Sequence, residues 1–377
     1  MKKRRTFTAA LCAPLAAILL TLALSACSSP LERDGSPDGN ILEGDTSPTA
    51  VVERLQELMS PEDFEYLFPR RFGTPGWREH SHRHDNVDYY SYENLLEAIR
   101  RMASLVYEIE FRDHGGGQTM NWTSRAFVTN KATGRRTPVF ENPGFNSPYN
   151  INRPVITQTV DFGAFLGRGS ENDRRRELAA FLANTAHETT GGWETAPGGR
   201  FAWGLFFNEE VAFTGSTAQN YWAPGDPNFP PVPGRSYHGR GPIQLSWNYN
   251  YGLFSAIVFQ DQNVLLQNPQ RVVECGILGW QTALWFWMTP QSPKPSCHEV
   301  MTGAWIPTAQ DTAAGRTHPG FGMTIMVING GLEQNLTEAD GRILSRVGFY
   351  RRIAARIGAN ISGEKLDTAG MTAAGWQ

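Results

Sequence analysis

The amino-acid sequence predicts a mainly α-helical protein with a small strand content. Two observations lead to this prediction. Apolar residues recur at intervals of three and four in several long segments, and few segments alternate with a period of two for long. At 377 residues, with 40% hydrophobic and 19% charged residues, the chain can bury a sizeable core. It also carries 11 Trp, 11 Tyr and 21 Phe, whose flat rings suit sugar faces as well as a core.

The first 26 residues have the pattern of a lipoprotein signal peptide. Four basic residues precede an apolar stretch, and a Leu-Ser-Ala-Cys sequence similar to a bacterial lipobox ends at Cys27. We therefore expect secretion, cleavage before Cys27 and lipidation of that residue. The alternative is a transmembrane anchor, but the apolar run is shorter than the roughly 20 residues that span a bilayer. In lipoproteins that this leader resembles, an Asp directly after the lipidated Cys often marks retention in the inner membrane, and this chain has Ser28 there. The expected location is therefore the outer membrane, on either its periplasmic or its surface face.

Two further properties follow from the leader. Residues 27–50 are rich in Ser, Pro, Gly and Asp, so we expect a flexible tether between lipid and folded domain. Loss of the four basic residues of the leader changes the formal charge from −3 to −7. A net negative chain argues against nucleic acid as a partner and is compatible with a neutral polymer.

The first helices are predicted from Val51 and from Ser91 to Met102, because apolar residues mark one face of each. Between them lies a polar loop with three histidines at positions 80, 82 and 84. Without a fourth ligand or an ordered spacing we interpret it as a solvated loop and assign no metal. Residues 111–153 are rich in Gly, Asn, Thr and Pro, and are expected to form loops with short strands. The segment at 105–152 is expected to be an inserted loop region of the domain.

The central helices have the clearest boundaries. A capping motif at Ser170 starts an amphipathic stretch that ends at the glycine pair 191–192. A second helix is predicted from about 273 to the residue before Pro290, and a third from about Thr337 to Gly358, which would cap it. Cys275 and Cys297 remain after the signal peptide and the lipidated residue are accounted for. They form either a disulfide or two buried free thiols.

The first candidate catalytic carboxyl, that of Glu188, lies near the end of the helix that starts at Ser170. The partial negative charge of a helix C-terminus disfavours an ionised Glu188 and raises its pKa, as a general acid needs, although a solvated glutamate before a glycine stop would look the same. Glu209 and Glu210 follow 21 and 22 residues later. Glycoside hydrolysis uses two carboxyl groups on either side of the bond. In an extended segment only one of these two neighbours can face a substrate, and the residue pattern alone leaves the choice open.

A series of short motifs follows in the second half of the chain. The motifs are HETTGGW at 187–193, FAWG at 201–204, GRGPIQLS at 239–246, NYNYG at 248–252, WFWMT at 285–289, INGG at 328–331 and RVGFY at 346–350. In order and rough spacing this series resembles the glycoside hydrolase family 19 chitinases. The resemblance is dense from about 156 to 358 and weaker in FEYLFPRR at 64–71 and YSYENL at 90–95.

This resemblance implies a two-lobed, lysozyme-like α+β fold with a substrate cleft between lobes, here a catalytic domain at 51–360 followed by a C-terminal tail at 361–377. It implies endo-acting hydrolysis of β-1,4-linked N-acetylglucosamine chains with inversion. No cofactor is implied, and the expected partner of the monomer is chitin or a chitooligosaccharide. Rival interpretations are a peptidoglycan-directed glycosidase and a non-catalytic carbohydrate-binding lipoprotein.

The resemblance also assigns roles residue by residue. Glu188 matches the general acid, Glu210 rather than Glu209 the general base, and Ser246 the residue that holds the attacking water. We expect Arg346 to lie near Glu210 and to keep that base ionised. The implied substrate-binding positions, including charged groups that interact with the catalytic pair, are His187, Trp203, Gln244, Tyr249, Asn250, Lys294, Asn329, Glu333 and Arg346.

Three positions depart from the family pattern. Phe206 stands where plant members commonly have Cys, Trp247 replaces a common His, and His238 replaces a common Tyr. These residues lie in or beside the motifs, so they bear on subsite preference rather than on the reaction.

Overall fold

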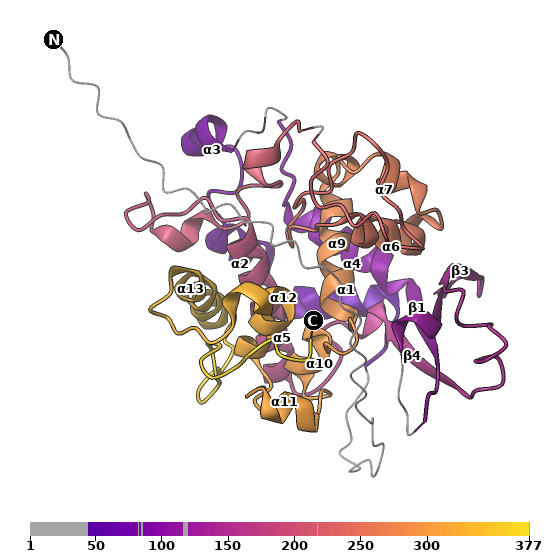
Figure 1. Ribbon diagram of the computed structural model, residues 1–377. Helices are drawn as coiled ribbons and strands as arrows, with labels where there is room; N and C mark the ends of the chain where they lie inside the picture. The colour runs from indigo at the N-terminus through magenta and orange to yellow at the C-terminus, as the bar shows by residue number, and fades with distance from the viewer. Residues whose placement is uncertain (1–43, 82, 84–85, 116–119, 217, 377) are drawn as a thin grey trace.

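A computed structural model describes residues 44–81, 83, 86–115, 120–216 and 218–376 (Figure 1). The elements run in chain order as α1 (Pro48–Leu58), α2 (Pro61–Leu67), α3 (Pro75–His80), α4 (Tyr92–Ala103), β1 (Leu105–Arg112), β2 (Ser124–Asn130), β3 (Arg136–Glu141), β4 (Val155–Asp161), α5 (Glu171–Glu188), α6 (Asn248–Phe259), α7 (Asn263–Gln267), α8 (Arg271–Glu274), α9 (Gly276–Met288), α10 (Cys297–Thr302), α11 (Ala309–Ala313), α12 (Phe321–Glu333) and α13 (Gly341–Ile357). The mainly helical fold with a small sheet is confirmed.

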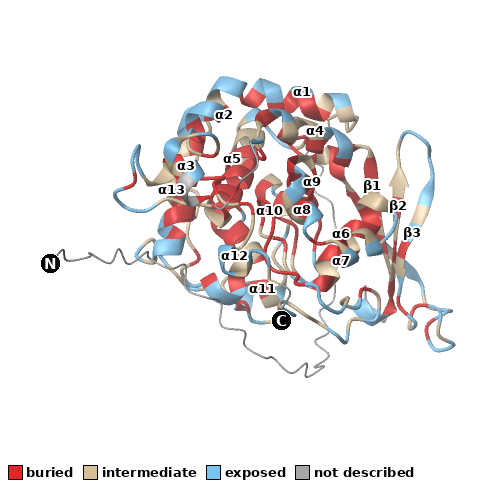
Figure 2. Cartoon of the chain, turned by 90° about the horizontal axis from the view of Figure 1, so that it is seen from above, coloured by how far each residue is buried: buried red, intermediate tan, exposed pale blue. Residues whose placement is uncertain are grey.

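Two helix pairs form the middle of the molecule. α5 packs along α13, and α4 packs along α9 and α1. Figure 2 shows buried residues in red along α5 and α9. α9 is buried nearly all round and contributes Trp280, Trp285 and Trp287 to the core. A helix with apolar residues on every side belongs inside a domain, so its burial follows from composition rather than from amphipathic spacing.

Two predicted helix starts are confirmed by their caps. The hydroxyl groups of Ser91 and Ser170 accept hydrogen bonds from the first-turn backbone of α4 and α5. The stretch predicted as one helix from 273 is two, α8 and α9, because Cys275 adopts an extended conformation between them. α13 begins at Gly341, four residues after Thr337, and Gly358 caps it in the left-handed conformation as predicted.

The segment at 105–152 contains most of an antiparallel sheet with strand order β3-β2-β1-β4. Leu105 pairs with Asn130 at one end of the β1–β2 ladder, and Phe111 pairs with Ser124 at the other. The sheet lies at one side of the helical body (Figure 1). Phe140 of β3 contacts the ring of Phe229, with ring centroids 6.1 Å apart, so the sheet braces a loop that leads into the site described below.

Both ends of the catalytic domain extend further than predicted. Ser47 caps α1, which starts at Pro48, and Gly44 donates a backbone hydrogen bond to Gly167, so residues 44–50 are folded rather than part of a tether. In the predicted tail at 361–377, the described residues 361–376 are packed on the domain. Arg316 donates to the carbonyl oxygens of Thr372 and Ala374, and Met371, Ala373 and Trp376 are buried. Isolated apolar residues without a period gave no sign of this packing.

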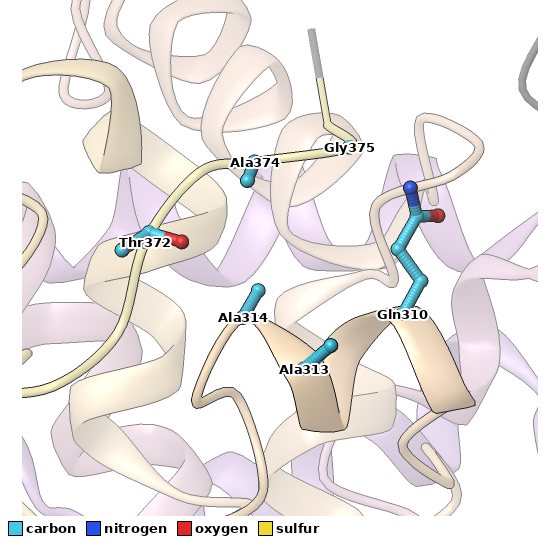
Figure 3. Close-up of a pocket in the computed structure, with 6 residues that line it drawn as sticks. All are labelled: Gln310, Ala313, Ala314, Thr372, Ala374 and Gly375. Atoms are coloured by element: carbon cyan, nitrogen blue, oxygen red, sulfur yellow. The ribbon is translucent and has the colours of Figure 1, made fainter.

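A cavity of about 170 Å³ lies between α11 and this C-terminal segment (Figure 3). It shares no residue with the predicted site. Its lining residues are Gln310, Ala313, Ala314, Thr372, Ala374 and Gly375.

Of the two alternatives for Cys275 and Cys297, the structure has free thiols, although only one of them is buried. Cys275 is an exposed free thiol between α8 and α9, whereas Cys297 is a buried free thiol at the start of α10. The signal peptide and Cys27 lie outside the described residues. Within the described ranges, none of the helices is both long enough and apolar enough to cross a bilayer.

Candidate active site

Glu188 is the last residue of α5, and the residue after it fastens the next part of the site. Thr189 ends the helix, and its side-chain oxygen accepts a hydrogen bond of 3.1 Å from the backbone of Leu205. Its carbonyl oxygen accepts two more, from the backbone N–H groups of Phe206 and Phe207. The segment at 205–207 is therefore fixed to the C-terminal end of the helix that carries Glu188.

Arg346, fully buried on α13, connects two carboxyl groups. Its Nη2 donates to Glu188 Oε1 at 2.5 Å and to Glu333 Oε1 at 2.8 Å, and its Nε donates to Glu333 Oε2 at 2.9 Å. Its remaining nitrogen donates to the side chain of Asn184 at 3.0 Å. A planar guanidinium with all three nitrogens occupied has a fixed orientation. The close packing of α5 along α13 brings these groups together.

The pKa values of Glu188 and Glu333 are shifted in opposite directions. The Glu188 side chain is 18% exposed, and burial raises its pKa, with Arg346 opposing the rise and the charge of Glu333 adding to it. Burial also acts on Glu333, but Arg346, His187 and Asn329 together outweigh it and lower the pKa of Glu333 to about 2. Arg346 therefore pairs mainly with an ionised Glu333, and Glu188 is biased toward its protonated form.

The expectation that Arg346 lies near Glu210 is wrong. Its hydrogen bonds to glutamates go to Glu188 and Glu333. Arg346 is 158 residues from Glu188 in sequence, and only the packing of α13 on α5 decides which carboxyl it meets.

Glu210 lies on a short backbone ladder. Its N–H donates to Gly239 O at 2.9 Å, and the N–H of Gly241 donates to Asn208 O at 2.8 Å. Arg240 in turn exchanges backbone hydrogen bonds with Leu245 in both directions. Since residues 205–207 are fixed to Thr189, a continuous series of backbone contacts runs from the end of α5 through Glu210 to the residue before Ser246.

The carboxylate of Glu210 accepts a forked hydrogen bond from the hydroxyl of Tyr221, at 3.0 and 3.2 Å, and a longer one from the backbone of Gly239 at 3.4 Å. The carboxylate of Glu209 instead accepts from His238 Nε2 at 3.2 Å and lies 3.8 Å from Arg240 Nε. The two neighbouring carboxylates therefore have different partners, as expected for adjacent side chains of an extended segment.

Ser246, Gln244 and Asn250 lie together at the turn that leads into α6. The Ser246 hydroxyl donates to Gln244 O at 2.9 Å, and the Asn250 side chain donates to Ser246 O at 2.9 Å. Gln244 and Trp247 both have positive φ, at 52° and 76°. A non-glycine residue in this region is strained and needs support from its surroundings, and such strain is frequent at functional sites.

An aromatic row continues from this turn. The ring of Trp247 stacks on Tyr249 with centroids 6.1 Å apart and meets Tyr221 edge-on at 5.5 Å. Trp247 is 38% exposed. The predicted substrate residue Tyr249 is thus connected through rings to the residue that holds Glu210.

The remaining predicted residues differ in their surroundings. Asn329, at a kink in α12, donates to Glu333 Oε1 at 2.8 Å. His187 is half-buried, and burial together with Arg346 lowers its pKa to about 3, so the ring is neutral. Lys294 is half-buried in a tight turn with Gln291, and burial lowers its pKa.

Trp203 is not placed to stack on a sugar. It is 3% exposed, belongs to a small hydrophobic cluster, and donates to Pro197 O at 3.0 Å. Phe206, which stands where a plant cysteine is common, packs in the same cluster. The prediction of a substrate-binding role for Trp203 is therefore corrected to a packing role.

Sequence reasoning missed Tyr221 and Glu209 with His238 as neighbours of the base. A single tyrosine in a loop carries no pattern, and its role appears only through the contact with Glu210. The departure at His238 was visible in the sequence but its partner was not. Among the described residues, there is no group of three or more His, Cys, Asp or Glu side chains that could hold a metal ion.

The chain matches the model of a known protein family. The family model described as Chitinase class I, of glycoside hydrolase family 19, matches residues 143–368, which is more than half of the chain. The protein is therefore a glycoside hydrolase. It belongs to family 19, the chitinase class I family, and the matched range contains both candidate catalytic carboxyls and Ser246.

Two relatives from plants agree with this assignment. The chain is 46% identical over 227 residues to Chitinase 9 of Oryza sativa subsp. japonica, a match that covers 58% of this chain and 65% of that protein. It is 50% identical over 212 residues to an endochitinase of Carica papaya, covering 56% of this chain and 83% of that protein. The chitinase C structure from Streptomyces griseus HUT6037 is 24% identical with a TM-score of 0.48, covering 82% of this chain and 97% of that chain.

Proposed function

We propose that this protein is an endo-acting, inverting chitinase that hydrolyses β-1,4-linked N-acetylglucosamine chains. The single observation that supports this most is the asymmetry of the two carboxyl groups within a family 19 domain. Burial raises the pKa of Glu188, whereas the Glu210 carboxylate accepts the hydroxyl hydrogen bond of Tyr221. A general acid must carry a proton and a general base must lack one, so unlike surroundings separate the two roles.

In this mechanism Glu188 protonates the glycosidic oxygen as the bond to the leaving sugar breaks. Glu210 accepts a proton from water as that water attacks the anomeric carbon from the opposite face. Ser246 directly follows the last residue of the ladder that carries Glu210, and its hydroxyl can accept a hydrogen bond from the water. Attack from the opposite face gives a product of inverted anomeric configuration.

Product stereochemistry and substrate choice test the proposal together. Chitin oligosaccharides and purified peptidoglycan are offered in parallel, and the anomer of the first product is followed by NMR. Release of the α-anomer from chitin oligosaccharides supports the proposal. Release of the β-anomer contradicts inversion, cleavage of peptidoglycan alone identifies a cell-wall glycosidase, and binding without cleavage identifies a carbohydrate-binding protein.

We also propose that Cys27 is lipidated and that the enzyme is anchored to the outer membrane. The lipobox-like sequence before Cys27 supports this. Cys27→Ala should release the chain from the membrane fraction or leave it unprocessed. If the variant still partitions fully into detergent at the mature mobility, the anchor is not at Cys27.

A further inference from the structure

A buried polar cluster beside the base is not used by the mechanism above. His238, 0% exposed, contacts Ser236 Oγ through Nδ1 at 2.8 Å and Glu209 Oε2 through Nε2 at 3.2 Å. Ser236 is also buried. The three residues form one chain of hydrogen bonds that ends on the carboxylate next to Glu210.

The surroundings of His238 select one tautomer. Arg240 Nη2 lies 3.4 Å from Nδ1, and a guanidinium can only donate, so Nδ1 must be an acceptor. Nε2 then carries the hydrogen and donates to Glu209, which can only accept when ionised. A second proton on Nδ1 would face the cation of Arg240. This arrangement keeps the imidazole neutral.

Several groups among the described residues act on the charge of the His238 ring, and Thr214 also hydrogen-bonds the Glu209 carboxylate that faces it. Burial lowers the pKa of His238, the hydrogen bond to Glu209 raises it, Arg240 lowers it, and the charges of Glu209 and Glu210 raise it, with a net lowering. The ring stacks on Phe213 with centroids 5.7 Å apart. The backbone of His238 is held by the Tyr251 hydroxyl, which donates to its carbonyl oxygen at 2.9 Å.

The cluster reaches the base through the backbone. Gly239, which follows His238, accepts from Glu210 N at 2.9 Å and donates to Glu210 Oε2 at 3.4 Å. The Gly239 N–H belongs to the peptide that follows His238, so a shift of the His238 backbone would move this donor relative to the carboxylate. Glu209 fixes the same segment from the other side, because its backbone pairs with Arg240 while its side chain receives His238.

We propose that the Ser236–His238–Glu209 chain positions the Glu210 carboxylate, with His238 as a neutral positioning residue. The inference rests on the proposed function in one respect: it takes Glu210 as the base. His238 touches no reacting atom, and it acts through Gly239 and Glu209.

The test uses pairs of variants that keep or remove the hydrogen bonds. His238→Phe keeps the stacking on Phe213 and removes both bonds, whereas His238→Gln can still donate to Glu209 and accept from Ser236. Glu209→Ala removes the acceptor, whereas Glu209→Gln keeps one. The remote pair of the exposed His318 with Thr317 supplies the control His318→Phe.

We expect His238→Phe and Glu209→Ala to lower kcat at least tenfold with KM changed less than threefold. Their acid limbs in kcat/KM against pH should move to higher pH, because the base loses a donor to its ionised form. His238→Gln and Glu209→Gln should stay within a few-fold of the parent with unmoved acid limbs, as should His318→Phe. The proposal is overturned if kcat falls equally in the variants that keep the hydrogen bonds and in those that remove them. It is also overturned if the acid limb stays in place in both His238→Phe and Glu209→Ala.

A second measurement is independent of activity. In ¹⁵N-histidine NMR of the protein, His238 should show a neutral ring protonated at Nε2 at pH 6, and Glu209→Ala should alter that signal. An Nδ1-protonated or cationic ring overturns the proposal even if a variant fails to fold. If the parent cleaves no chitin oligosaccharide, the proposed function fails while the NMR result still decides the hydrogen-bond chain.

Discussion

The surroundings of Glu188 and of Glu210 are built differently. Glu188 accepts a hydrogen bond from Arg346, a side chain on a helix far away in sequence that also pairs with the buried Glu333. Glu210 is held by backbone hydrogen bonds within a nearby loop and by one tyrosine hydroxyl. The placement of the general acid therefore depends on the tertiary packing of helices, whereas the placement of the general base depends on local loop geometry. Substitutions should therefore separate the two halves of the site.

The largest effects are expected at the two carboxyls themselves. Glu188→Gln and Glu210→Gln should each lower turnover of chitin oligosaccharides by roughly 10² to 10⁴-fold. Substrates with an activated aryl or fluoride leaving group need no protonation, so they should recover activity in Glu188→Gln and not in Glu210→Gln. Initial rates on both substrate types give the comparison. Rescue of Glu210→Gln alone would exchange the two assignments.

Removal of the shared cation tests the acid side. Arg346→Met leaves Glu333 and Glu188 buried without their partner, and we expect a loss of roughly 3 to 5 kcal/mol in the free energy of unfolding. Urea denaturation at neutral pH measures it. The exposed Arg351, which pairs with Glu338, provides the control, and Arg351→Met should cost at most about 1 kcal/mol. Equal losses would show that burial of the Arg346 network contributes nothing special.

Acid titration examines the same network without changing its packing. The pKa of Glu333 is lowered from its usual 4.5 to about 2 in the folded chain. A depressed pKa gives stability that is present above pH 4.5 and is lost as the pH falls toward 2. Unfolding free energies at several pH values in this window should fall less steeply in Glu333→Gln than in the parent. Parallel slopes would contradict the ionised Glu333–Arg346 pair.

The smallest expected effect lies on the base side. Tyr221→Phe removes the hydroxyl that donates to Glu210. Because that bond favours the ionised carboxylate, its loss should lower kcat by no more than a few-fold and move the acid limb of kcat/KM to higher pH. The basic limb, which reports Glu188, should not move. A shift of both limbs would mean that the two sides are coupled.

Local signals predicted more of the molecule than long-range ones. The capping motif at Ser170 and the glycine cap at Gly358 located the ends of two helices, because capping is a property of a few adjacent residues. The apolar face from Ser91 to Met102 located a third helix. The resemblance located Glu188 and Glu210. The partner of Arg346, the burial of Trp203 and the packing of the segment ending at Trp376 were not predicted, because each depends on contacts between distant parts of the chain. The hydrogen-bond partner of His238 was missed for the same reason.

The backbone ladder from Thr189 through residues 205–207 to Glu210 has a consequence for heat inactivation. The relative placement of acid and base is fixed by main-chain hydrogen bonds that belong to the core, with Tyr90 donating to Phe207 O at 2.7 Å as a further tie. These hydrogen bonds are not expected to break one after another while the rest of the domain stays folded. On heating, catalytic activity and the near-ultraviolet signal of the buried tryptophans should disappear over the same narrow range of temperature, as parts of one cooperative unit.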